Sequence, residues 1–196
     1  MARPSRGRRP GGPDTRADVL AAARQSFAEK GFRGTTIRAV AAEAGVDPSL
    51  VHHYFGTKDE LFLAAMELPV DPREVLLPVI DGPRDQVAER FLGAFLGVWD
   101  DPALQPALLT VVRSALEPGG DRLFSEGFLP VIVQPIGVAL GLDRPEHRMP
   151  LLASQVLGLI LMRYVLRVEP IASMSPALLI ATYAPTIQRY LTGELP

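Results

Sequence analysis

Apolar residues recur at helical spacing along this chain of 196 residues, and no stretch shows sustained alternation with a period of two. The first such stretch places Val19, Leu20, Ala23 and Phe27 on one face of a helix. A half-buried strand needs alternating apolar and polar residues, so the pattern excludes a β-sheet as the main architecture. Because 47% of the residues are apolar and 21% are charged, the chain can bury a core of its own. We therefore predict an all-α fold of about nine helices.

Capping and turn residues divide the first third of the chain into short helices. Asp47 precedes Pro48, a pair that favours an N-cap followed by the first helical position. Thr57 and Glu60 have the spacing of a capping box. The expected helices run from Asp14 or Thr15 to Gly31, over 37–44 between Thr35 or Thr36 and Gly45, from Asp47 to about Phe55, and onward from Thr57.

The remaining two thirds of the chain show helical periodicity interrupted by proline. Pro69, Pro72 and Pro78 interrupt the fourth helix or the connection that follows it. Further helices are expected at about 83–99, 102–117, 121–141, 145–168 and 175–193, the third of them kinked or split by Pro130 and Pro135.

Basic residues are concentrated towards the amino-terminal end. Residues 1–66 hold ten Lys and Arg against seven Asp and Glu, whereas residues 67–196 hold ten against fifteen. Residues 1–13 are mostly Pro, Gly and Arg, so we expect a disordered basic tail there. The distribution is compatible with a polyanionic partner at one end of the protein, and equally with a solvated terminus.

The composition also excludes several kinds of site and segment. Without cysteine the chain can form no disulfide, zinc–thiolate site or iron–sulfur cluster. The most apolar run, Phe128–Leu142, is too short to cross a bilayer and contains two prolines. The first residues lack the apolar stretch of a signal peptide. We therefore expect a soluble protein of the cytoplasm.

The second and third helices have the dimensions of a helix-turn-helix motif, with Gly45 and Val46 in the turn. If Val46 is buried between these helices, the third helix directs Ser49, Leu50, His52 and His53 outward. Such a face can enter a major groove, where a hydroxyl donates or accepts and a histidine can bond to guanine or phosphate. Leu50 can touch a thymine methyl group or pack within the domain.

Residues 15–66 resemble the DNA-binding domain of the TetR family of transcriptional regulators. The matching features are Gly31-Phe32, Thr35-Thr36, Ile37, the Val40-Ala41-x-x-Ala44-Gly45-Val46 core, Tyr54-Phe55 and Lys58-x-x-Leu61. Leu157–Pro170 and Ser175–Leu191 are also similar to the last two helices of actinobacterial members. The resemblance implies a helix-turn-helix domain over 14–66 and a helical bundle over 67–196 that binds a small effector and dimerises.

The resemblance also implies roles for individual side chains. Arg38 matches a position at which the family contacts a base or a phosphate, and Tyr54 and Lys58 match positions that grip the DNA backbone. His52 stands where the family usually has tyrosine, which puts its phosphate contact in doubt. The candidate DNA-binding residues are Thr36, Arg38, Pro48, Ser49, Leu50, His52, His53, Tyr54 and Lys58.

Any effector pocket must lie in the second part of the chain. Phe91, Phe95 and Trp99 recur every four residues, a pattern more typical of a core than of a pocket wall. Arg163 interrupts an apolar run, so it pairs with an acid such as Glu169, reaches the surface or meets an anionic ligand. The candidate ligand-binding residues are Phe95, Trp99, Arg113, Gln155 and Arg163.

The last two helices carry more apolar residues than one small core requires. Two such helices meeting their symmetry mates would form a four-helix interface between identical subunits. The candidate interface residues are Leu157, Leu161, Tyr164, Ile180, Ala184 and Ile187.

The residue patterns give little support to metal binding or catalysis. His52 and His53 lie about 100° apart on a helix, and the one other histidine is His147. The chain has no phosphate-binding loop, no nucleophile elbow and no acid–base pair at a recognisable spacing. We therefore expect no metal, no cofactor and no enzymatic activity.

Together these observations predict a sequence-specific DNA-binding repressor. It would bind a pseudo-palindromic operator as a homodimer and be released by a small hydrophobic effector. One alternative is a constitutive DNA-binding protein without an effector. Another is an all-α carrier or enzyme that has lost DNA binding.

Overall fold

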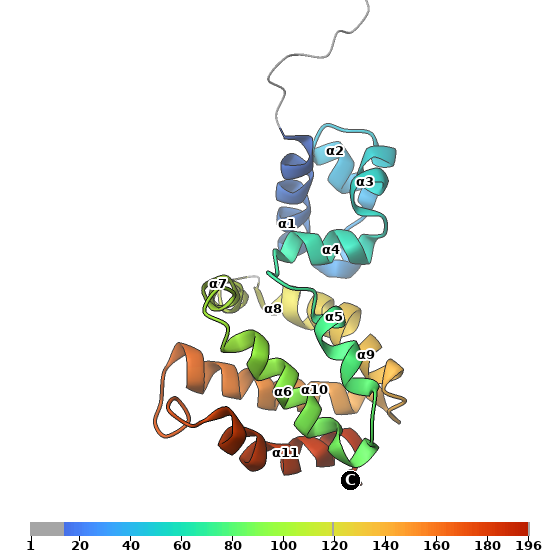
Figure 1. Cartoon of the computed structure of the whole chain (residues 1–196). Coiled ribbons are helices and arrows are strands. Elements are labelled where there is room, and N and C mark those ends of the chain that lie inside the picture. Colours follow the sequence, from blue (N-terminus) through green and yellow to red (C-terminus); the bar gives the residue numbers. More distant parts are fainter. Residues whose placement is uncertain (1–13, 119, 196) are drawn as a thin grey trace, which may run out of the picture. The chain divides into compact units, whose positions relative to one another are not determined.

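The computed structural model describes residues 14–118 and 120–195, and the chain divides into two compact units, Met1–Met66 and Glu67–Pro196. Within those described ranges every regular element is helical, as Figure 1 shows, which confirms the predicted all-α fold. The basic tail expected over 1–13 lies outside the described residues.

Four helices form the first unit. They are α1 (Thr15–Gly34), α2 (Ile37–Glu43), α3 (Pro48–Phe55) and α4 (Lys58–Met66). The longest, α1, packs mainly against α4, while α2 contacts both α1 and α3. Asp14 rather than Thr15 caps α1, because its carboxylate accepts from the backbone N–H groups of Arg16 and Ala17.

An aromatic cluster fills the core of the first unit. The side chains of Phe27 and Phe62 are fully buried, and their rings meet edge to face with centroids 5.1 Å apart. Phe32 contacts both rings. Close to this cluster in sequence, the Arg24 Nε atom donates to the Ala65 carbonyl at 3.1 Å, which ties α1 to the end of α4. The unit therefore has a core of its own.

The structure refines the expected end of the first helix. Gly31 breaks the helical geometry with the expected positive φ, at φ 69° and ψ 174°, and a further helical turn beyond this kink carries α1 to Gly34. The Gly31 carbonyl accepts a 2.9 Å hydrogen bond from the Thr35 hydroxyl, which lies 3.2 Å from the Ser26 hydroxyl. Both hydroxyl-bearing residues are fully buried, and this small network satisfies polar groups that the kink leaves unpaired.

The second unit consists of α-helices, short 3₁₀ turns and two π-helical stretches. Its long helices are α6 (Val87–Trp99), α7 (Gln105–Ala115), α10 (Pro145–Ile160) and α11 (Pro176–Thr192). The shorter elements are α5 (Pro72–Leu76), η1 (Leu77–Ile80), η2 (Arg84–Gln86), α8 (Gly120–Arg122), η3 (Leu123–Val133), α9 (Gln134–Ala139) and η4 (Leu161–Val165).

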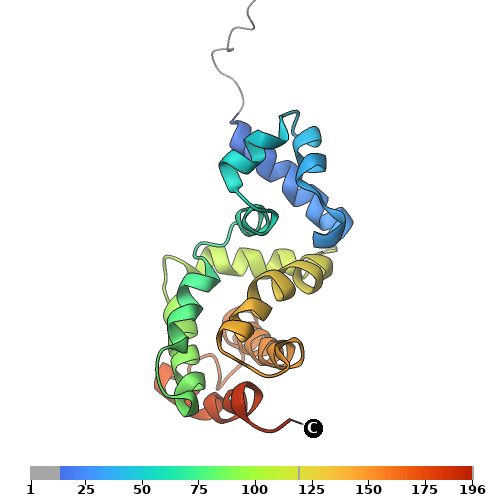
Figure 2. The same cartoon turned by 90° about the vertical axis from the view of Figure 1, so that its right-hand side faces the viewer.

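The core of the second unit lies where α6 packs along α11. This is its most extensive helix pair, and α10 contacts α11 as well as α9. Figures 1 and 2 both show α6 and α11 side by side within the unit. The buried faces contribute Leu92 and Leu96 from α6 and Leu179, Ile187 and Leu191 from α11.

Two of the helices expected in this unit change helix type along their length. The expected helix 121–141 runs as α8, the π-helix η3 that contains Pro130, and then α9, which has Pro135 in its first turn. The expected helix 145–168 likewise becomes π-helical after Ile160 and ends near Leu166. Pro150 and Pro185 lie inside α10 and α11, which remain α-helical, so proline by itself does not set the helix type.

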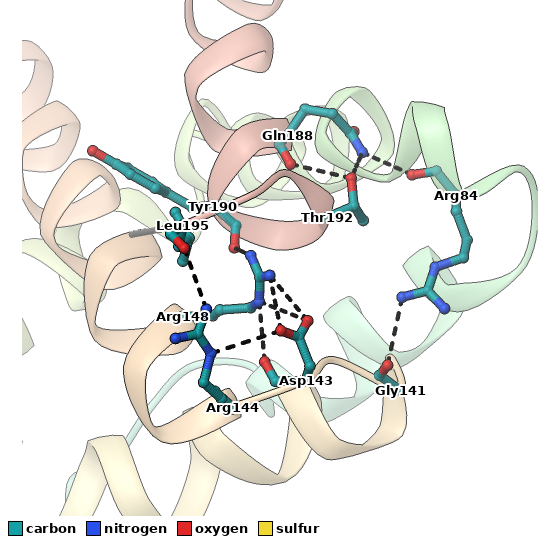
Figure 3. Close-up of polar contacts among 9 residues, drawn as sticks. All are labelled: Arg84, Gly141, Asp143, Arg144, Arg148, Gln188, Tyr190, Thr192 and Leu195. Atoms are coloured by element: carbon teal, nitrogen blue, oxygen red, sulfur yellow. Dashed lines mark hydrogen bonds and ion pairs between the residues drawn. The ribbon is translucent and has the colours of Figure 1, made fainter.

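A buried arginine ties the start of α10 to the end of α11. The Arg148 side chain is 4% exposed, and its Nη1 atom donates to the Tyr190 carbonyl at 2.8 Å. Its Nε and Nη2 atoms donate to the carboxylate of Asp143, and Nε also donates to the Asp143 carbonyl at 3.0 Å (Figure 3). These contacts hold the pKa of Asp143 below its usual range.

Replacing Arg148 with Met is expected to lower the free energy of unfolding by about 2 kcal/mol, because buried carbonyl groups lose their charged donor. Urea unfolding followed by circular dichroism measures the loss. Arg144→Met is the matched control, since Arg144 is exposed and its hydrogen bond to the Leu195 carbonyl is 3.5 Å long. Equal losses in both variants would contradict the assigned role of Arg148.

Candidate DNA-binding site

The turn between α2 and α3 has the geometry of a helix-turn-helix. The Thr36 hydroxyl oxygen caps α2 by accepting from the Ala39 N–H at 3.1 Å. Gly45 adopts φ 68° after α2, a left-handed conformation that favours glycine. Asp47 caps α3 by accepting from the Ser49 N–H at 2.8 Å, and Pro48 is the first helical residue. The predicted cap at Asp47 is confirmed, and of the two residues expected for α2, Thr35 or Thr36, the structure selects Thr36.

The buried and exposed faces of α3 are separated cleanly. Val51 and Phe55 are buried in the first unit, and they anchor a helix of eight residues that would not be stable alone. Ser49, His52 and His53 are exposed, and Tyr54 is 42% exposed. Pro48 and Leu50 are half-buried. Val46, expected to be buried between the two helices, is only half-buried as well.

Ser49 has a defined hydrogen-bonding role that the sequence did not reveal. Its hydroxyl donates to the Asp47 carboxylate at 2.6 Å, in the same cap that receives its backbone N–H. These two bonds hold the pKa of Asp47 below its usual value, so the cap is charged at neutral pH. The Ser49 oxygen is left to accept, which suits the amino group of cytosine or adenine.

The His52 side chain also forms a hydrogen bond within its own helix and cap. Its Nδ1 atom lies 2.8 Å from the carbonyl oxygen of Gly56, the residue that caps the end of α3. A carbonyl can only accept, so in this arrangement Nδ1 carries the hydrogen and the neutral ring presents an acceptor at Nε2. A phosphate oxygen also accepts, so the Nε2 atom of a neutral His52 cannot donate a hydrogen bond to a phosphate.

His53 and Tyr54 continue the exposed face of α3. Their ring centroids lie 5.6 Å apart at an interplanar angle of 52°, so each ring limits the freedom of the other. Tyr54 also meets Phe55 edge to face, with ring centroids 6.2 Å apart. The contacts connect an exposed aromatic pair to the buried anchor of the helix.

Lys58 is held by the aromatic core rather than extended into solvent. Its ammonium nitrogen lies 4.3 Å from the centroid of the Phe32 ring, a cation–π contact. Desolvation lowers the pKa of Lys58, and the nearby Asp59 carboxylate opposes this shift. The predicted capping box is present just beyond it, with Glu60 accepting from the Thr57 N–H at 2.7 Å and Thr57 accepting from the Glu60 N–H.

Arg38 has the most available charge in this region. It is exposed on the first turn of α2, and within residues 14–118 and 120–195 it forms no ion pair. Arg16 was missed by sequence reasoning: its guanidinium carbon lies 5.1 Å from the Phe55 ring centroid, at the back of the recognition helix. No spacing in the sequence indicates this contact, because it joins the first and third helices.

The candidate ligand-binding residues occupy different surroundings in the second unit. Phe95 and Trp99 are buried in a column of rings that also includes Phe91 and Tyr164. Gln155 is half-buried, whereas Arg113 is exposed on α7. The column therefore belongs to the core of the unit.

Arg163 has a different partner from the one expected. Its Nη2 atom lies 3.3 Å from the Asp100 carboxylate, and its Nη1 atom donates to the carbonyls of Ile171, Ala172 and Met174. The Tyr164 hydroxyl donates to Asp100 at 2.9 Å, and burial raises the pKa of that hydroxyl. Asp100 thus replaces Glu169, whose carboxylate instead accepts from the Ser173 hydroxyl. This arrangement satisfies the guanidinium without an anionic ligand.

Three of the six candidate interface residues belong to the interior of the unit. Tyr164, Ala184 and Ile187 are buried within the single chain, so they are not available to a second copy. The helical pattern marked them as apolar but could not tell core from interface. Leu157, Leu161 and Ile180 are half-buried. Leu151 and Leu178 are 38% and 53% exposed on α10 and α11.

Two negative observations concern only the part of the chain that the structure describes. Among those residues, no group of three or more His, Cys, Asp or Glu side chains could hold a metal ion. In the same residues, no helix has the length and apolar character needed to cross a membrane.

Comparisons with known proteins agree with this geometry. A family model for bacterial regulatory proteins of the tetR family matches residues 19–65, and one for the tetracyclin repressor-like C-terminal domain matches residues 85–191. The chain belongs to the TetR family. The family consists of DNA-binding transcriptional regulators, and nothing in the comparisons points to an enzyme.

Individual relatives match different parts of the chain. The HTH-type transcriptional regulator BetI of Brucella anthropi is 44% identical over 54 residues, 28% of each chain. BetI of Stenotrophomonas maltophilia is 30% identical over 131 residues, 58% of this chain and 65% of the relative. The chain thus covers less than two thirds of these relatives' length. A TetR-family regulator from Streptomyces coelicolor is 39% identical, with a TM-score of 0.52 over 94% of this chain and 98% of that structure.

Replacing Gly45 with Ala is expected to lower the free energy of unfolding by about 1 kcal/mol, because an alanine at φ 68° is strained. Nothing lies within 4 Å of the position that the added methyl group would take, so steric contact adds no cost. Thermal or urea unfolding measures the change. Gly45→Asn is the control. It should lower the free energy of unfolding less than Gly45→Ala does, since asparagine adopts this conformation more readily than alanine. A larger loss for Asn than for Ala would contradict a backbone origin.

Proposed function

We propose that this protein is a transcriptional repressor that binds a pseudo-palindromic operator as a homodimer and is released by a small-molecule effector. Residues 14–66 form the DNA-binding domain, and residues 67–196 bind the effector and dimerise. The observation that best supports this proposal is the exposed polar face of α3, a helix capped by Asp47 and anchored by Val51 and Phe55. A regulator of this kind acts in the cytoplasm, in contact with the chromosome.

In this proposal the first turn of α3 enters the major groove. Pro48, Ser49 and Leu50 lie nearest the base edges, with Ser49 as an acceptor and Leu50 against a thymine methyl group. His53 is exposed on the next turn and can donate to a guanine acceptor or to a phosphate. His52 accepts through Nε2 when neutral, so its contact is with a donor.

Contacts with the DNA backbone surround this reading face. Arg38 supplies an exposed, unpaired guanidinium for a phosphate or a base. The Thr36 and Tyr54 hydroxyl groups can donate to phosphates, since the cap bond of Thr36 uses its oxygen only as an acceptor. Lys58 contributes its charge from its position over Phe32. Such contacts make the affinity fall steeply with salt.

Dimerisation is assigned to the exposed apolar positions of α10 and α11. Leu151 and Leu178 are exposed, and Leu157, Leu161 and Ile180 are half-buried, so burying them against a second copy removes apolar area from water. An interface of two helices from each subunit has twofold symmetry, which matches the symmetry of a palindromic operator.

Release by an effector requires a change that reaches the DNA-binding domain. We assign its transmission to residues 67–82, which contain α5 and η1. Arg90 on α6 donates to the Val79 carbonyl at 3.0 Å, so a movement of α6 also moves this segment. The effector favours a dimer whose recognition helices are spaced wrongly for the two half-sites. It is a small hydrophobic molecule, because the interior of the bundle is apolar.

The purified protein is expected to select one inverted repeat from a pool of random duplex DNA. Arg38→Ala and His53→Ala should each weaken binding to that repeat by roughly ten- to a hundredfold, the cost of one lost base or phosphate contact. Fluorescence anisotropy with the selected duplex measures the affinities. Arg167→Gln is the control, because this exposed arginine lies in the second unit.

Two outcomes would contradict this part of the proposal. Failure to enrich any repeat, in protein from which small molecules have been removed by refolding, would exclude sequence-specific binding. If Arg167→Gln and Arg38→Ala lost equal affinity for the selected duplex, the effect of replacing Arg38 would come from net charge alone.

Leu178→Glu is expected to convert the dimer into a monomer of 21.2 kDa, since it places a charge in the proposed interface. Light scattering coupled to size-exclusion chromatography measures the mass. Leu116→Glu is the matched control, because Leu116 is 61% exposed at the end of α7, outside the proposed interface. A wild-type monomer at micromolar concentration would refute the dimer and the palindrome together.

A constitutive DNA-binding protein without an effector is the second candidate. The contacts of Arg163 favour this second candidate. Arg163 interrupts an apolar run, and its charge is already paired with Asp100 and backbone carbonyls, so it needs no anionic ligand. A melting temperature that responds to no compound in a broad library, together with intact operator binding, would support this candidate. A compound that raises the melting temperature and releases the operator would exclude it.

A further inference from the structure

A small hollow lies at the end of the second unit where α11 ends. Its cavity volume is about 30 Å³. This is room for roughly two waters or one carboxylate group. The residues that line it come from three separate segments of the chain: Ile80, Gly82, Arg84, Val87, Arg90, Leu140, Leu142 and Thr192.

The first of its two arginines is held rigidly. Arg90 donates from Nε to the Val79 carbonyl at 3.0 Å and from Nη1 to the Pro83 carbonyl at 2.9 Å. Gly82 has φ 127°, and a Cβ atom there would lie 3.1 Å from the guanidinium carbon of Arg90. The loop thus closes over the guanidinium, and only backbone carbonyls are hydrogen-bonded to Arg90.

The second arginine is free to adjust. Arg84 is exposed, and its Nη2 atom makes only a long 3.4 Å hydrogen bond to the Gly141 carbonyl (Figure 3). Its own carbonyl accepts from the Gln188 amide at 2.8 Å, which fixes the backbone while the side chain remains adjustable. A guanidinium with spare donors beside a fixed one is well suited to grip an anion.

Neither arginine is neutralised within the described residues. Asp85 and Glu89 are adjacent in sequence to Arg84 and Arg90, and Asp81 lies shortly before them, yet all three are exposed and none forms an ion pair with either arginine. Val87 begins α6, so the positive end of that helix dipole adds to the local potential. Two like charges on one hollow repel each other, and an anion between them relieves the repulsion.

Four of the residues that line the hollow are apolar. Val87 and Leu142 are buried, and Ile80 and Leu140 complete this apolar part of the lining. An inorganic oxyanion would lose hydration there without compensation, whereas a carboxylate with a short alkyl group satisfies both sides. We propose that this hollow binds a small carboxylate, with the carboxyl group between Arg84 and Arg90 and the alkyl group against Val87 and Leu142. This proposal does not depend on the proposed repressor function.

The test is a titration of the full-length ¹⁵N-labelled protein with sodium acetate in place of sodium chloride, at constant sodium concentration and neutral pH. Saturable shifts are expected for the amide resonances of Gly82 and Gly141, which flank the two arginines. Arg84→Gln should weaken the binding of acetate at least about tenfold, since it removes a charge-assisted contact. The exposed position of Arg84 means that this variant retains the fold.

Three controls make the result decisive. Arg167→Gln removes an exposed arginine elsewhere in the unit and should leave the affinity for acetate unchanged. Acetamide has the same shape without the charge and should cause no saturable shift. Sodium phosphate should bind more weakly than acetate. Shifts that do not saturate, an unchanged affinity in Arg84→Gln, equal binding of acetamide or preference for phosphate would each overturn the proposal.

Discussion

An eight-residue helix cannot hold its shape in water, so the proposed reading face depends on how α3 is attached to the first unit. Val51 and Phe55 bury one side of the helix, and the aromatic cluster of Phe27, Phe32 and Phe62 supplies the core of the same unit. The cap at Asp47 supplies the acceptor that the first turn needs. Burial and capping together leave the remaining sides of α3 free for a partner.

Hydrogen bonds at the two ends of α3 also limit what the proposed reading face can offer to a partner. Because Ser49 donates to Asp47 and His52 donates to the Gly56 carbonyl, both side chains face a partner as acceptors in their neutral forms. A hydroxyl and an imidazole can in general donate or accept, and local bonds within α3 remove that freedom. Helix stability and chemical specificity therefore come from the same hydrogen bonds.

In the second unit, two largely buried arginine side chains are neutralised by hydrogen bonds to carboxylates and backbone carbonyls. Arg148 and Arg163 both enter a largely apolar interior, and each finds a carboxylate and several backbone carbonyls. Such arginines join segments that are distant in sequence, in one case α10 with α11 and in the other η4 with Asp100 and the loop before α11. Arg84 and Arg90 contrast with them, because backbone carbonyls satisfy part of each guanidinium and no carboxylate among residues 14–118 and 120–195 pairs with it.

The sequence by itself determined the helical class, the cap at Asp47, the capping box at Thr57 and the family resemblance, because these features depend on residues within a few positions of each other. Only the tertiary structure decided that Arg163 pairs with Asp100, 63 residues away, and that Tyr164, Ala184 and Ile187 lie in the interior of the unit. Helical periodicity identifies an apolar face, but both a core and an interface bury such faces. The distinction depends on which helices meet in space, and local spacing carries no information about that.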